Sequence, residues 1–127
     1  METPIRLLLV DDEARVRQGL LMCMSGEPDF DVIGEAQEGG EAISLVSELR
    51  PDVVVMDVRM HGVDGIEATR QLAALEPATK VVVLSLQDDA RTRHEALASG
   101  ASAFVGKQEG IARLFEVIRS AAGKAAS

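Results

Sequence analysis

Residues 53–65 read V-V-V-M-D-V-R-M-H-G-V-D-G, a short apolar run that ends on an acid and is followed by a loop. The stretch opens with a β-branched apolar run that is too short for a helix, follows Pro51 and leads into a glycine-containing loop, which is typical of a strand buried on both faces. Asp57 therefore stands where this strand leaves its sheet. Residues 7–12, L-L-L-V-D-D, repeat the pattern, so two buried strands end on carboxylates. In open α/β sheets this edge is where ligands bind.

The rest of the chain alternates between strand and helix patterns. We expect strands at residues 5–10, 30–36, 53–56, 80–84 and 103–105, and helices at about 11–25, 39–50, 66–75, 88–99 and 110–122. Five strands alternating with five helices predict a doubly wound α/β fold, in which a parallel sheet with right-handed crossovers carries helices on both faces. With 127 residues and 46% hydrophobic content the chain is expected to form one domain, residues 1–127, whose core spans about 5–123.

Composition excludes several classes of function. The net charge of −8 argues against nucleic-acid contact by this chain itself, because phosphate contacts dominate such binding. No apolar run approaches the roughly 18 residues of a membrane span, and the M-E-T-P start lacks the features of a signal peptide. We therefore expect a cytoplasmic protein without membrane contact. The single cysteine, Cys23, excludes an internal disulfide and is expected to pack inside on a helix.

Polar side chains follow four of the expected strands. Asp11 and Asp12 follow the first, Asp57 the third, Ser85 the fourth and Lys107 the fifth. Clustered carboxylates repel one another and therefore call for a cation. Mg²⁺ suits them, because it takes hard oxygen ligands from carboxylates, water and phosphate. A hydroxyl and an ammonium on the other flank could hold phosphate oxygens. The pattern thus predicts a site for a phosphoryl group.

These residues resemble a known family. The motifs L-L-V-D-D-E, D-V-R-M-H-G-V-D-G, V-L-S and A-F-V-G-K, in this order, are similar to the receiver domain of two-component response regulators. The stretches E-P-D-F-D-V-I-G-E-A, R-P-D-V-V-V-M-D and G-I-E-A-T-R resemble the NarL/FixJ (LuxR-type) class, whose members usually carry a C-terminal helix-turn-helix. The resemblance implies a flavodoxin-like receiver fold with strand order 2-1-3-4-5.

The resemblance also implies a role for each site residue. Asp57 would accept a phosphoryl group from a sensor histidine kinase. Mg²⁺ would be bound by Asp12, Asp57 and the main-chain carbonyl of Arg59, with Asp11 supporting the ion through water. Lys107 would pair with the phosphate, Ser85 would donate its hydroxyl to it, and Phe104 would be the aromatic switch residue. The chain would then act as a signalling receiver, not as a turnover enzyme.

Partners follow from the same resemblance. A second copy of the chain, joined on phosphorylation, is a candidate partner beside the kinase. No output domain lies within the 127 residues, so DNA would be contacted by a helix-turn-helix outside them, for transcription regulation. The chain could equally be a fragment or a single-domain regulator.

Three other functions remain open at this point. A degenerate receiver that no longer accepts phosphate is one, because His61 stands where the family usually has proline. A haloacid-dehalogenase-like Mg²⁺ phosphatase is the second, but it needs a second acid where this chain has Arg59. A flavodoxin-like FMN protein is the third, although D-D-E would repel its phosphate and the chain has three Phe and no Trp or Tyr. Asp64 is expected to be a turn residue, and Glu13 to point away from the metal.

Overall fold

The structure, a computed structural model, describes residues 3–58 and 64–123. Within them a five-stranded parallel sheet has the order β2-β1-β3-β4-β5, which is the predicted 2-1-3-4-5. The strands are β1 (Ile5–Val10), β2 (Phe30–Ala36), β3 (Val53–Met56), β4 (Lys80–Ser85) and β5 (Ala103–Gly106). All four residues of the central strand β3 are buried, as its unbroken apolar run predicted.

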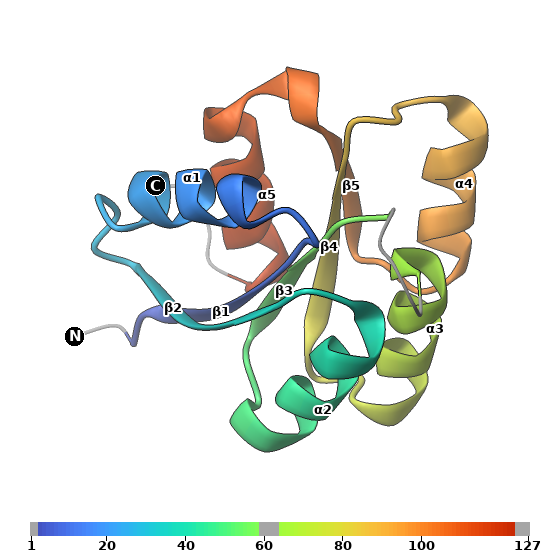
Figure 1. Ribbon diagram of the computed structural model, residues 1–127, viewed down its shortest axis with the longest axis horizontal. Coiled ribbons are helices and arrows are strands. Elements are labelled where there is room, and N and C mark those ends of the chain that lie inside the picture. Colours follow the sequence, from blue (N-terminus) through green and yellow to red (C-terminus); the bar gives the residue numbers. More distant parts are fainter. Residues whose placement is uncertain (1–2, 59–63, 124–127) are drawn as a thin grey trace.

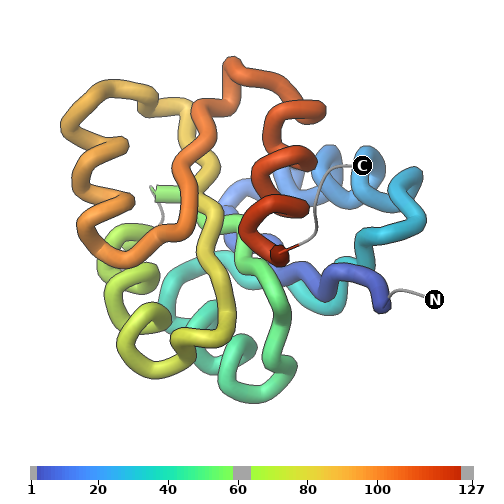
Figure 2. The backbone as a smooth tube through the Cα atoms, turned by 180° about the vertical axis from the view of Figure 1, so that it is seen from behind, coloured from blue at the N-terminus to red at the C-terminus, as the bar shows by residue number. Residues whose placement is uncertain are grey.

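Helices cover both faces of the sheet (Figures 1 and 2). They are α1 (Ala14–Met24), α2 (Gly39–Leu49), α3 (Gly65–Leu75), α4 (Ala90–Ala98) and α5 (Ile111–Ala121), with a short 3-10 turn, η1 (Lys107–Glu109), before α5. Alternate residues of each strand supply two separate apolar cores, because successive side chains of a strand point to opposite faces. Leu7 and Leu9 pack with α1 and α5, whereas Leu8 and Val10 pack with α2, α3 and α4.

Side chains cap the N-termini of α2, α3 and α4. Asp64 caps α3 by accepting a hydrogen bond from the Glu67 main-chain N–H at 2.9 Å, so it does more than turn the chain. Asp89 caps α4 through the Thr92 N–H at 2.7 Å, and this bond holds the pKa of the Asp89 carboxyl below its ordinary value.

In the part of the chain that the structure describes, no helix is long and apolar enough to cross a bilayer.

Two expectations about α1 were wrong. Cys23 is exposed, because the helix turns Met24 into the core in its place. The helix also begins at Ala14, after the acids that were expected to open it. Residues 11–13 form the loop between β1 and α1, where Asp11 Oδ1 accepts the Glu13 N–H at 2.9 Å. The two aspartates are thereby kept at the sheet edge.

Candidate functional site

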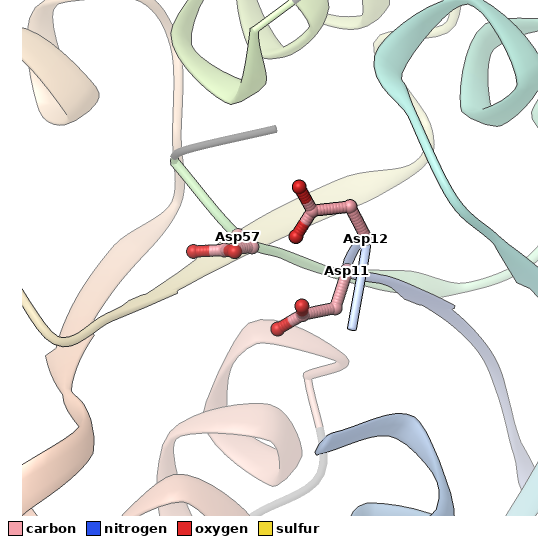
Figure 3. A group of neighbouring side chains, drawn as sticks. All are labelled: Asp11, Asp12 and Asp57. Atoms are coloured by element: carbon pink, nitrogen blue, oxygen red, sulfur yellow. The ribbon is translucent and has the colours of Figure 1, made fainter. Parts of the chain in front are cut away.

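Three carboxylates meet where β1 and β3 end. The main chain brings them together: the Asp57 N–H donates to the Val10 carbonyl at 2.9 Å, and the Asp11 N–H donates to the Ala36 carbonyl at 3.1 Å. These bonds extend the sheet ladder just past each strand. In Figure 3 the side chains of Asp11, Asp12 and Asp57 project to the same side of the sheet edge. One oxygen from each lies within 4.8 Å of the other two.

This spacing fits a magnesium ion. Mg²⁺ holds oxygens at about 2.0 to 2.1 Å in an octahedron, so adjacent ligands stand about 2.9 Å apart and opposite ligands about 4.2 Å apart. Small side-chain rotations would bring the three oxygens from 4.8 Å or less into that range. Asp11 is buried, at 4% exposure, while Asp12 and Asp57 are half-buried and open to solvent on one side. The acids present are the hard donors that this ion prefers.

A lysine balances part of the negative charge. Lys107 lies just past β5, and its Nζ is 3.4 Å from Asp11 Oδ2, with only 19% of the lysine side chain exposed. Burial strengthens such an attraction, because less solvent screens the pair. Lys107 is therefore held by the Asp11 carboxylate, and both Lys107 and Asp57 border the same hollow.

A hydroxyl completes the ring of polar groups. Ser85, at the end of β4, is 2% exposed, and its Oγ accepts the Gln87 main-chain N–H at 3.0 Å. A serine hydroxyl accepts and donates at once, so this bond leaves its proton for another oxygen. A hollow of about 310 Å³ lies beside it, bordered by Glu13, Asp57, Ser85, Leu86, Gln87 and Lys107. The hollow is large enough for a phosphoryl group and its waters.

Phe104 lies near these polar side chains but does not border the hollow. It pairs with Val83 across the β4–β5 ladder, two residues before the pair of Ser85 with Gly106. The Phe104 residue is 6% exposed and belongs to the apolar core on the α2, α3 and α4 side of the sheet. The Arg93 guanidinium covers it, with Cζ 4.7 Å from the ring centroid.

Five of the predicted site residues are thus brought together: Asp11, Asp12, Asp57, Ser85 and Lys107. Arg59, predicted as a carbonyl ligand, and His61 lie outside the described residues. Two residues near the site were missed. Glu13 borders the hollow, although it is not part of the carboxylate cluster and was expected to point away from the metal. Arg17 donates from Nη1 to the Asp11 main-chain carbonyl, which no sequence pattern signals, because the acceptor is a backbone group.

Comparisons with known proteins find related sequences and structures. Residues 7–119 match the family model described as response regulator receiver domain. The transcriptional regulatory protein LiaR of Bacillus subtilis is 40% identical over 117 residues, which is 92% of this chain and 56% of that protein. The chain therefore spans about half the length of this relative. A crystal structure of a LuxR-family two-component response regulator from Aurantimonas has 34% identity and a TM-score of 0.90, with 98% of this chain and 90% of that chain covered.

A second kind of relative shares the same region. A protein-glutamate methylesterase/protein-glutamine glutaminase of Anaeromyxobacter dehalogenans is 44% identical over 107 residues, 84% of this chain but only 31% of that protein. Relatives with different names thus share one region that corresponds to most of this chain. The similarity concerns that shared region and not the remainder of either relative.

Proposed function

Because the chain belongs to the response regulator receiver domain family, we propose that it is a phosphorylation-activated receiver whose Asp57 takes a phosphoryl group from a sensor histidine kinase with Mg²⁺. One observation carries the proposal: three carboxylates from two strand ends lie within 4.8 Å, beside a buried hydroxyl and a lysine. A solely structural edge has no need to gather three acids that repel one another.

The chemistry assigns one task to each side chain. An Asp57 oxygen attacks phosphorus, the bond from phosphorus to the donor breaks, and its electron pair leaves with the donor, which gives an aspartyl phosphate. Lys107 and the Ser85 O–H then face the transferred oxygens and offset their charge. Asp11 and Asp12 hold the ion, which when bound neutralises charge on the phosphoryl group.

The arrangement favours a phospho-acceptor over a turnover enzyme. A haloacid-dehalogenase-like phosphatase would need an acid two positions after the nucleophile, where this chain has Arg59. Hydrolysis of the aspartyl phosphate then resets the protein but does not make it a catalyst for a separate substrate. The five site residues argue against a degenerate receiver.

The wider setting belongs to the same proposal. LiaR is a transcriptional regulator by name, which supports transcription regulation as the output here too. We assign the whole chain to one receiver domain acting in the cytoplasm, with DNA contacted by a helix-turn-helix outside it. A second copy of the chain, bound after phosphorylation, is the expected partner of the active form.

Intact-mass spectrometry tests the assignment. Incubation with acetyl phosphate and Mg²⁺ should add the mass of one phosphoryl group, and EDTA should abolish the gain. The Asp57→Asn variant should remain unlabelled because an amide cannot form the acyl phosphate. Asp31→Asn, an exposed acid on β2 far from the cluster, is the matched control and should be labelled like the wild type. Equal labelling of Asp57→Asn and the wild type would contradict the assignment.

A further inference from the structure

Arg17 of α1 contacts both the acidic site and the neighbouring strand β2. Its Nη1 donates to the main-chain carbonyl of Asp11, and its Nε lies 3.0 Å from Glu35 Oε1 on β2. Only 13% of the Arg17 side chain is exposed, against 39% for Glu35. A guanidinium is a rigid planar fork with several donors, so different nitrogens of Arg17 serve the two partners at once.

The carbonyl that accepts from Arg17 belongs to the peptide unit joining the two metal-side aspartates. A peptide unit is planar and includes both flanking Cα atoms. Its orientation therefore sets where the side chains of Asp11 and Asp12 begin. The Asp11 N–H is bonded to Ala36 and its Oδ1 to the Glu13 N–H, which restrain the loop on either side of this peptide. Arg17 restrains the peptide itself.

From this geometry we infer that Arg17 is a positioning residue for magnesium binding: it holds the Asp11–Asp12 peptide so that both carboxylates reach one ion. The inference rests on the proposed function, since the ion is part of it. Residues outside the ligand set that orient metal ligands typically contribute about 10- to 100-fold to metal affinity. A guanidinium has no lone pair to offer a cation, and the oxygen cluster consists of Asp11, Asp12 and Asp57, so Arg17 acts through Asp11 and Asp12.

The alternative role for Arg17 is a simple tie between α1 and β2 through Glu35. Three variants separate the two roles. Arg17→Met keeps an unbranched apolar stem but removes every donor. Arg17→Lys keeps a charged donor that can reach the Asp11 carbonyl. Glu35→Gln removes the ion pair with Arg17 while the Asp11 contact persists.

Titration of each full-length variant with Mg²⁺, followed by amide ¹H–¹⁵N NMR shifts, measures the Kd and shows from the same spectra that the protein is folded. Arg17→Met should raise the Kd by about tenfold and displace the Asp12 amide signal, Arg17→Lys should recover most of the affinity, and Glu35→Gln should match the wild type.

Equal losses in Arg17→Met and Glu35→Gln would overturn the inference, because the tie to β2 would then explain the effect. An unchanged Kd in a folded Arg17→Met variant would overturn it while leaving the proposed function intact. A wild-type protein that binds no Mg²⁺ would overturn both.

Discussion

Gly65 shows at the scale of one residue how closely α3 approaches the proposed acceptor. A Cβ at this position would lie 1.9 Å from the Asp57 carbonyl oxygen and 2.8 Å from Val58 Cα. The Gly65 N–H also donates to the Val58 carbonyl at 3.0 Å. The first turn of α3 is thus pressed against the backbone that carries Asp57. Here glycine is required by space, since any side chain would push the acceptor residue.

Gly65→Ala should therefore destabilise the protein by about 1–3 kcal/mol, the usual cost of overpacking, and slow phosphorylation of Asp57. Gly19→Ala is the matched control, because Gly19 lies inside α1 with nothing within 4 Å of its added Cβ. It should stabilise the protein by about 0.5–1 kcal/mol through higher helix propensity. Urea unfolding of both variants checks this. Equal stability of Gly65→Ala and the wild type would contradict the close packing.

Sequence patterns predicted which residues form the site more accurately than they predicted the exposure and contacts of individual side chains. Asp11, Asp12, Asp57, Ser85 and Lys107 were found because each follows an apolar run, which is a local signal. The exposure of Cys23 was not foreseen, since one helical position more or less decides which side chain faces the core. The contact of Arg17 with a main-chain carbonyl likewise leaves no trace in residue types.

At the scale of elements, one arginine fastens the end of α5 to the loop before β2. Arg119 Nε lies 2.7 Å from Asp29 Oδ2 and Nη2 lies 3.0 Å from Asp29 Oδ1, while Nη2 also contacts Glu27 Oε1 at 2.7 Å. Its guanidinium lies over the Phe30 ring, 4.7 Å from the centroid. The two acids raise the pKa of Arg119 above its already high ordinary value. These contacts join residues about 90 positions apart in the chain.

Arg119→Ala should lower the free energy of unfolding by about 2 kcal/mol, because a paired and stacked arginine is lost although the cluster is partly open to solvent. Arg113→Ala, on the same helix, is the control. Its ion pairs are 3.8 and 4.0 Å long and its side chain is 55% exposed, so the change should stay below about 0.5 kcal/mol. Thermal unfolding measures the stability of both variants. Similar losses of stability in both would contradict a particular contribution of the Arg119 cluster.

The elements themselves were largely predictable. Continuous β-branched runs and helical periodicity predicted all five strands and five helices within a few residues, because each pattern reports burial along one element. The ends were less accurate, as at α1 and α4, since a helix start depends on local hydrogen bonds that the hydrophobic pattern does not report. The Arg119 cluster was not predictable, because charge complementarity between distant segments appears only once the fold brings them together.

At the scale of the whole molecule, the site and the α4–β5 side of the fold are connected through one strand pair. Ser85 and Val83 point to the same face of β4, as alternation requires, and Phe104 pairs with Val83. Arg93 holds Phe104 from outside: it covers the ring, reaches the Phe104 carbonyl at 3.4 Å, and pairs with Asp88 at 2.9 Å and Glu109 at 3.5 Å. The strand order was predictable from the resemblance, whereas the position of Arg93 over the Phe104 ring was not.

Phosphorylation of Asp57 should therefore change the positions of Ser85, Phe104 and Arg93. A phosphoryl group adds roughly −1.5 to −2 charges, so it should draw the Ser85 hydroxyl toward Asp57 and leave space into which Phe104 can move. That motion would separate the ring from Arg93 and loosen the contacts of Arg93 with Asp88 and Glu109. The ion pairs of Arg93 with Asp88 and Glu109 are partly exposed and individually weak. The unphosphorylated protein should therefore already sample the conformation in which Arg93 has left Phe104.

Hydrogen exchange with and without beryllofluoride, a mimic of the aspartyl phosphate, measures this coupling. Protection should change across residues 84–104, which include the end of β4, all of α4 and Phe104. Protection in α2 should stay constant, because that helix packs against α3, β2 and β1 and makes none of the Arg93 contacts. Asp57→Asn is the control and should show no response, since it lacks the carboxylate that binds the mimic. A response confined to the residues next to Asp57 would contradict the route through Phe104, because a ring that stayed in place would leave α4 unchanged.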